Sequence, residues 1–428
     1  MLIFYYNIDV YPINKGLFHH SYSEIIQKIF AKSSNKIALI ILLVAIVVIS
    51  YFAIGSIEYV DSSGNSHTGI TAYNRLKEVK NEWKGNITES VLQEVLEENN
   101  KIKSSEEYLS KNDTENNIAY SRGQGFSDIK DMINRSFCDF QEYDYYRVDT
   151  VTPTELGNFY SNRIDNLKKW LSSDSVKDNY TKQEKEYLVE KYEEMQIPFY
   201  YEYAGAWTSL LYYLPVLIML IMLVGTFLIS GIFSDEFRLK ADSIFFSTVY
   251  GRSKAIRSKI VAGFVCITAI YWISICCFSG VVLGCLGIDG ANCLIQTSLG
   301  GWKSFYNITL LQKFLLTIIG GYIGVLFMST LSMLVSAKMR SSVLAVIVPF
   351  VILLVPSFLS DFSVLSKILG LLPDQLLQIS SSVNYFNVYQ IGSKVIGAIP
   401  ILFTIYLICY FILLPLLYRI YKKSELNS

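Results

Sequence analysis

The sequence predicts an all-α polytopic membrane protein with six transmembrane helices, and three observations carry this prediction. Of the 428 residues, 52% are hydrophobic and only 17% are charged, a composition typical of membrane proteins. Six apolar runs approach or exceed the roughly 20 residues that a helix needs to cross the hydrocarbon core. None of the six runs contains Asp, Glu, Lys or Arg. The predicted spans are residues 37–57, 209–233, 260–286, 314–337, 343–359 and 395–418.

The segment before the first span, residues 1–36, is expected to be cytoplasmic and to end in an amphipathic interfacial helix. Tyr22, Ile25 and Ile29 fall on one face of that helix, and lysines border the apolar stripe. Such lysines can reach phosphate headgroups while the apolar side chains stay buried in the membrane surface. The alternative is a helix that only extends the first span.

Residues 58–206, between the first two spans, are expected to form a mainly helical extracellular domain, which we call the polar domain. Residues 56–205 hold 18 Lys and Arg against 28 Asp and Glu, so the net charge is 18 − 28 = −10. Residues 152–155 and 181–184 match the capping box that begins a helix, in which a threonine precedes a glutamate by three positions. The domain therefore has helix starts of its own and an acidic surface.

Positive charges in the short connecting segments predict the orientation of the chain. They cluster before the first span, between spans two and three, between spans four and five, and after span six. With six spans, all four clusters fall on one side, which the positive-inside rule assigns to the cytoplasm. We therefore expect a multi-pass cell-membrane protein with both termini in the cytoplasm. Cys138 is the only cysteine of the polar domain, so no internal disulfide forms there, which suits a bacterial plasma membrane.

The loop between spans five and six, at about residues 360–394, is expected to be an extracellular re-entrant region. It is apolar but interrupted, and its leucines suit short helices that dip into the outer leaflet. Such broken backbone is tolerated at membrane depth only when it is packed against protein.

The charged segment, residues 233–259, connects spans two and three. Phe237, Ala241 and Phe245 share one helical face, and Gly251 ends that pattern. One explanation of the charge is topology alone, because basic residues hold a loop in the cytoplasm. The acidic pair at the membrane exit and the aromatic helix face favour contact with a partner protein instead.

An acidic residue just after span two, a helix, a Tyr-Gly-Arg turn and a Lys-Ile entry into span three follow one another in the charged segment. The residues of this pattern are Glu236, Asp242, Ile244, Ser247, Tyr250, Gly251, Arg252, Lys259 and Ile260. The pattern resembles that of the permease (transmembrane) subunits of ABC-type exporters of the second export class. The interfacial helix, Leu-Leu-Pro at 371–373 and the basic end at 418–427 add to the likeness. The large extracellular domain is similar to that of a subset in Gram-positive bacteria.

The resemblance implies that residues at about 235–258 form a cytoplasmic coupling helix that docks on a separate ABC ATPase subunit. It assigns this coupling to Asp235, Glu236, Phe237, Arg238, Asp242, Phe245, Gly251, Arg252 and Lys259. It also implies a homodimer, or a heterodimer with a second permease, and MgATP bound by the partner ATPase.

The chain carries no ATPase motif of its own. The phosphate-binding pattern G-x-x-x-x-G-K-[S/T] is absent, and the three histidines have no metal-ligand spacing. No catalytic residue, cofactor or metal is therefore expected in this chain, and nucleic acid is not expected among its partners. The spans also lack the charged residues typical of ion-coupled carriers, which favours an energy source outside the spans.

A substrate path between the spans is expected to use aromatic side chains. The candidates are Tyr212, Tyr271, Trp272, Tyr322 and Tyr406. An amphipathic lipid or peptide would tolerate such a lining. The alternative is that these side chains serve contacts between helices.

Two functions are compatible with these observations. The first is the transmembrane subunit of an ATP-driven exporter that moves an amphipathic peptide, lipid-like compound or drug out of the cell. Antimicrobial peptide resistance is one such role, because the polar domain's charge of −10 attracts cationic peptides. The second is a non-transporting membrane receptor or scaffold whose extracellular domain senses a ligand. A Walker-type ATPase partner distinguishes the first function from the second.

Overall fold

The computed structural model of the chain describes residues 17–247, 251, 253–298, 300–359 and 366–424. The fold is mostly helical, with only short strands, and the predicted membrane-embedded character is confirmed. Five helices of the described chain are long and apolar enough to cross a membrane. They are α2 (Ser33–Gly55), α10 (Gly205–Ile229), α13 (Lys254–Leu286), α14 (Leu310–Met339) and α19 (Ala398–Lys422).

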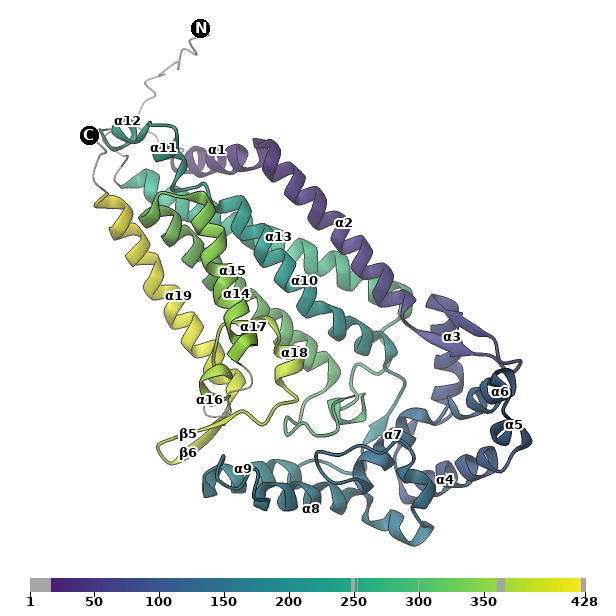
Figure 1. The fold of residues 1–428 in the computed structure, drawn as a ribbon. Coiled ribbons are helices and arrows are strands. Elements are labelled where there is room, and N and C mark those ends of the chain that lie inside the picture. Colours follow the sequence, from purple (N-terminus) through teal and green to yellow (C-terminus); the bar gives the residue numbers. More distant parts are fainter. Residues whose placement is uncertain (1–16, 248–250, 252, 299, 360–365, 425–428) are drawn as a thin grey trace.

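The sixth predicted span corresponds to α15, Ser342–Leu359. Its apolar stretch, Ser342–Pro356, is shorter than the other five helices. Helix α14 is the central element of the bundle, since it contacts α10, α13, α15 and α19 (Figure 1). Helices α13 and α14 both begin before the apolar runs that predicted them. The residues ahead of each run, which include polar ones, are helical as well.

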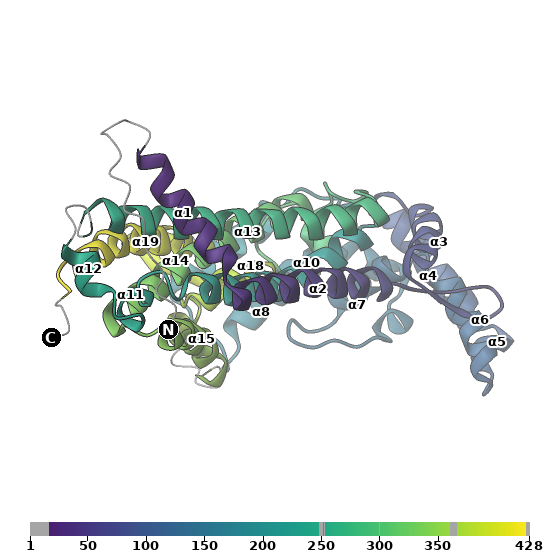
Figure 2. The same ribbon diagram turned by 90° about the horizontal axis from the view of Figure 1, so that it is seen from above.

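Helix α1, Leu17–Ala31, is separate from α2 and does not merely extend it. It lies across one end of the bundle, at an angle to α2, and packs against α13 as well (Figures 1 and 2). The buried amide of Asn35 fixes this corner by donating to the carbonyl oxygens of Ile29, at 2.8 Å, and Leu228, at 3.2 Å.

The polar domain lies at the opposite end of the bundle from α1 (Figure 1). Its helices are α3 (Gly69–Asn81), α4 (Glu89–Lys103), α5 (Glu106–Leu109), α6 (Asp113–Gly123), α7 (Ser127–Phe137), α8 (Phe159–Ser172) and α9 (Lys182–Glu193), with 3₁₀ turns η1 (Arg147–Thr150) and η2 (Pro153–Asn158). Short antiparallel strands pair β1 (Glu58–Val60) with β2 (Ser66–Thr68) and β3 (Gly85–Asn86) with β4 (Tyr200–Tyr201).

Both predicted capping boxes are present. At the start of α9, the Thr181 amide donates to Glu184 Oε2 at 2.9 Å, and the Glu184 amide donates to Thr181 Oγ1 at 3.2 Å. The box at Thr152 and Glu155 begins the 3₁₀ turn η2, which runs directly into α8.

Two later segments of the chain complete the cores of the polar domain. The connection between α13 and α14, which includes η3 (Ile295–Thr297), inserts Trp302 into one core and Phe305 into another. The hairpin of β5 (Val388–Ile391) and β6 (Lys394–Gly397) adds Val388 to the second core. Lys367 also pairs with the buried Glu184 at 2.7 Å. The polar domain is therefore built from three separate parts of the sequence.

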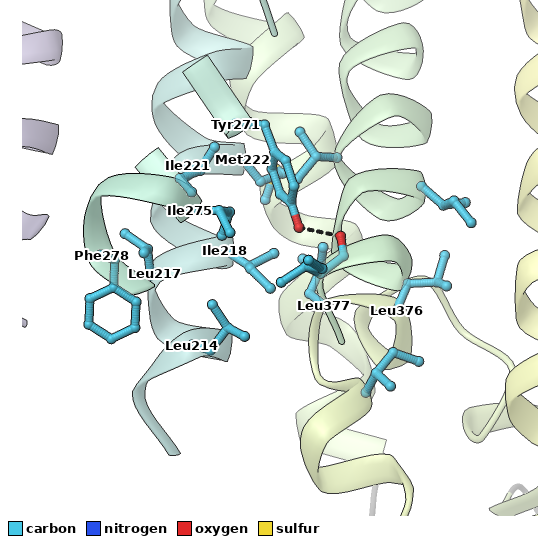
Figure 3. Packing of buried hydrophobic residues seen from close by; sticks show 14 of the residues in the cluster. Leu214, Leu217, Ile218, Ile221, Met222, Tyr271, Ile275, Phe278, Leu376 and Leu377 are labelled. Atoms are coloured by element: carbon cyan, nitrogen blue, oxygen red, sulfur yellow. Dashed lines mark hydrogen bonds between the residues drawn. The ribbon is translucent and has the colours of Figure 1, made fainter. Parts of the chain in front are cut away.

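The described part of the predicted re-entrant region forms three short helices, α16 (Ser366–Leu369), α17 (Asp374–Leu377) and α18 (Ile379–Ser382), followed by the hairpin. Residues 360–365 lie outside the described residues. Leu376 and Leu377 of α17 join the core formed by α10 and α13, near Ile218 and Tyr271 (Figure 3). The short helices thus pack against the long ones.

Glycines of α14 make this close packing possible. A Cβ atom at Gly320 would lie 2.6 Å from Ile379 Cγ1 of α18, and one at Gly324 would lie 2.8 Å from Leu377 Cδ2 of α17. Real Cβ atoms do not approach so closely, so a larger residue at either position requires the facing side chain or its helix to shift.

The substitution Gly320→Ala is expected to lower the unfolding free energy by about 1–3 kcal/mol, because the added methyl group overpacks the contact with α18. Thermal unfolding of the purified chain in detergent measures this loss. The control is Gly280→Ala in α13, where no described atom beyond the adjacent residues and the helix's own backbone lies within 4 Å of the new Cβ. This control should not lower stability, since alanine favours a helix more than glycine does. Equal losses for the two variants would contradict the packing role.

Candidate functional site

The charged segment folds into two short helices at the end of the bundle where α1 lies. These are α11, Asp235–Arg238, and α12, Asp242–Ser247 (Figure 1). Lys240 sits between them with a left-handed backbone, φ 54°. The sequence predicted one short helix and a turn here; a tight turn divides that helix in two. Arg252, one of the predicted coupling residues, lies outside the described residues.

An ion pair between the buried Lys259 and the partly buried Glu236 joins α11 to α13. Lys259 is only 5% exposed, and its Nζ lies 2.5 Å from Glu236 Oε1. The same Nζ donates to the carbonyl oxygen of Ile232 at 2.6 Å. The hydroxyl of Tyr421, near the end of α19, donates to Glu236 Oε2 at 3.2 Å. The Glu236 carboxylate therefore connects the charged segment to two of the long helices.

Aromatic rings surround this ion pair. The Tyr421 ring centroid lies 4.8 Å from that of Phe233 and 5.3 Å from that of Phe246. Lys259 Nζ lies 4.9 Å from the centroid of Phe245 and 5.3 Å from that of Tyr421, within the range of cation–π attraction. The aromatic face that the sequence singled out is therefore turned toward the chain's own α13 and α19.

Asp235, which also lies on α11, makes two further ion pairs. Its carboxylate pairs with Lys32, between α1 and α2, and with Arg238 at 3.0 Å. Two of the three acidic residues of the predicted coupling set, Asp235 and Glu236, thus have basic partners within the chain. Asp242 and Gly251 are buried as well.

Among the described residues of the charged segment, those of the turn between α11 and α12 form a continuous exposed surface. Leu239 is 69% exposed, and Lys240 is exposed beside it. The Arg238 side chain is 62% exposed although it pairs with Asp235. An exposed leucine flanked by two cations is the chemically distinctive surface of this segment.

Three of the five predicted substrate-path residues form one cluster between α13 and α14. The ring centroids of Tyr271 and Tyr322 lie 5.3 Å apart, and Trp272 lies 5.4 Å from each of them. The Tyr271 hydroxyl donates to the carbonyl oxygen of Ile318 at 2.6 Å, and the Tyr322 hydroxyl bonds with that of Thr268 at 2.8 Å. The hydroxyl groups of both tyrosines are therefore already engaged within the chain.

The other two predicted path residues lie apart from this cluster. Tyr406 of α19 is buried, and its hydroxyl donates to the carbonyl oxygen of Leu371 at 2.9 Å. Tyr212 of α10 is 74% exposed and lines a cavity of about 530 Å³ between the bundle and the polar domain. Glu58 and Asp128 also line this cavity. It combines aromatic rings with carboxylates.

Sequence reasoning missed Tyr421 and the connection between α13 and α14. Tyr421 lies in a basic stretch whose charges indicate only the orientation of the chain in the membrane. No local pattern links this tyrosine to Glu236. Within the described residues, no group of three or more His, Cys, Asp and Glu side chains could hold a metal ion.

Comparisons with protein-family models, with curated proteins and with solved structures found no match. Function is therefore argued from the residues of this chain.

Proposed function

We propose that this chain is the transmembrane subunit of an ATP-driven ABC exporter, with ATP hydrolysed by a separate subunit. The observation that carries the proposal is the attachment of the charged segment to the bundle. Glu236 links α11 to α13 and α19, and Asp235 links it to the corner between α1 and α2. A force applied to the α11–α12 turn would therefore act on four helices, as a coupling site requires.

The course of the chain supports six spans in this proposal. Helix α14 ends near α11 and α12, whereas α19 begins beside the polar domain (Figure 1). Helix α15 connects these two ends and acts as the sixth span. Helices α1, α11 and α12 then lie at the cytoplasmic face of the cell membrane, and the polar domain is extracellular.

The cavity beside Tyr212 suggests what the exporter carries. Its tyrosines offer ring faces to an apolar or cationic group, and Glu58 has no basic partner among the described residues. Asp128 already pairs with Lys80 at 2.6 Å. We favour an amphipathic substrate with a positive charge, such as a cationic peptide or drug, that leaves the spans beside the polar domain.

The test is affinity purification of the tagged chain from its native membrane in mild detergent, followed by mass spectrometry. A soluble Walker-type ATPase should co-purify, and Leu239→Asp and Lys240→Glu should each reduce its recovery at least about tenfold, since losing a central contact costs 2 kcal/mol or more. Both residues are exposed, so these variants leave the Glu236–Lys259 ion pair intact.

The control is Lys423→Glu, an exposed lysine after α19, which should retain the ATPase. If no ATPase co-purifies under conditions that preserve other membrane complexes, the exporter proposal fails. The receptor or scaffold function would then be the better supported of the two candidate functions.

A further inference from the structure

The polar domain contains a second cavity, far from the bundle. It has a volume of about 350 Å³ and lies among α4, α5, α6 and α7. In both views α5 and α6 form the edge of the domain farthest from α12 and α19 (Figures 1 and 2). Cavities that hold small organic molecules start at about this size. The cavity therefore suits a ligand of one or two rings.

Tyrosines form the wall of this cavity, and apolar side chains form its floor. Four half-exposed tyrosines line it, namely Tyr108, Tyr120, Tyr145 and Tyr146. The floor includes Ala119 and Phe126, which are almost fully buried. None of the four hydroxyl groups has a hydrogen-bond partner in the described part of the chain, so all four are available to a ligand. Tyrosine combines a ring face with a polar tip, a pairing that recognises flat, partly polar molecules.

Two lysines provide the charge of the lining. Lys103 pairs with Asp149, whose other oxygen accepts from the Asn99 amide at 3.0 Å. Lys130 has no carboxylate within ion-pair distance among the described residues. Its Nζ instead lies 4.8 Å from the ring centroid of Tyr145. Burial lowers the pKa of Lys130, and Lys103 lowers it further, whereas Asp149 opposes this change.

The lining contains no Asp or Glu, although the domain around it is strongly acidic. A cationic ligand would therefore meet two ammonium groups, of which only Lys103 has a carboxylate partner, and no carboxylate in the lining itself. An anion would supply the ion pair that Lys130 lacks. Because the unpaired amine lies against a tyrosine ring, the anionic group and the flat body of the ligand should be close together.

We propose that this cavity binds a small aromatic carboxylate, with the ring against the tyrosines and the carboxylate on Lys130. The inference is independent of the proposed function. It gives the polar domain a second site, opposite in charge preference to the cavity beside Tyr212. The ligand would be recognised without entering the spans.

Binding is tested with the full chain in nanodiscs, by equilibrium dialysis against radiolabelled 2-naphthoate. Two probes of the same ring system serve for comparison, neutral 2-naphthalenemethanol and cationic 2-naphthylmethylamine. Saturable binding of naphthoate alone is expected. Lys130→Gln should weaken it at least about tenfold, because hydrogen bonds to charged groups are strong, and Lys130→Arg should restore most of the affinity. Tyr145→Phe should weaken it less.

The control variant is Lys182→Gln, on the exposed face of α9 and 87% exposed at its side chain, which should bind as the unmodified chain does. Thermal unfolding of Lys130→Gln should match that of the control, which separates lost binding from lost folding. The proposal is overturned if the three probes bind alike, if the amine binds best, if none binds, or if Lys130→Gln binds normally. It is also overturned if Lys130→Arg fails to restore binding.

Discussion

Replacing Lys259 with methionine is expected to lower the unfolding free energy by about 3 kcal/mol, because it leaves the Glu236 carboxylate, only 22% exposed at its side chain, without its cation. Methionine fills the space of the lysine stem but leaves the Glu236 carboxylate beside aromatic rings. The carbonyl oxygen of Ile232 also loses its donor at 2.6 Å. Thermal unfolding of the detergent-purified chain, followed by near-ultraviolet circular dichroism, measures the loss. The control Lys423→Met, at an exposed lysine, should change stability by about 0.5 kcal/mol at most.

A double variant separates the ion pair from the packing around it. Glu236→Gln combined with Lys259→Met removes both charges and should be more stable than Lys259→Met alone. The two residues are in contact at 2.5 Å, so their effects should not add. Strictly additive losses would mean that the two side chains contribute separately, and the link between α11 and α13 would lose its basis.

Replacing Arg163 with methionine is expected to lower the unfolding free energy by about 2–3 kcal/mol, because the carbonyl group of Trp302 loses its donor and that of Ser304 keeps only the Gln296 amide. Arg163 is 4% exposed and donates to the carbonyl oxygens of Trp302, at 3.1 Å, and Ser304, at 2.9 Å. Its guanidinium also lies 3.7 Å from the ring centroid of Tyr192. Burial lowers the pKa of this guanidinium, yet arginine stays charged at every physiological pH.

Hydrogen exchange gives the second readout for Arg163→Met. Protection should fall in the connection between α13 and α14, which Arg163 holds, as well as in α8 itself. The control is Arg75→Met, since the exposed Arg75 pairs with Glu78, at 2.9 Å and one turn away, and with no other carboxylate among the described residues. That pair is worth about 0–1 kcal/mol. Unchanged protection around Trp302 in Arg163→Met would show that the connection is held by other contacts.

The long helices could be predicted from the sequence because their signal is local. An apolar run either reaches the length of a membrane or does not, and five of the six predicted spans lie on helices long and apolar enough to cross one. The helix starts at Thr152 and Thr181 were also predictable, since the capping box is a pattern of four residues.

The contacts that organise the candidate sites could not be predicted in this way. Glu236 and Tyr421 are 185 residues apart, and Arg163 and Trp302 are 139 apart. The sequence did contain a local signal for the β5–β6 hairpin, but the leucines before the hairpin outweighed it. Gly392, with φ 63°, and Ser393 form the two-residue turn of the β5–β6 hairpin, a familiar hairpin pattern. The leucines before it favoured short helices for the whole region.

The polar domain cannot rotate about a single connection to the bundle. It is continuous with α2 and α10, it takes Trp302 and Phe305 from the connection between α13 and α14, and it takes Val388 from the hairpin before α19. If these helices tilted relative to one another, the parts of the polar domain that they carry would therefore slide past one another. The seam between its two cores would bear that sliding, because Trp302 belongs to one core and Phe305 to the other. Arg163 donates to Trp302 and Ser304, and Tyr192 donates to Lys303 between them, so we expect the domain to open first at these hydrogen bonds.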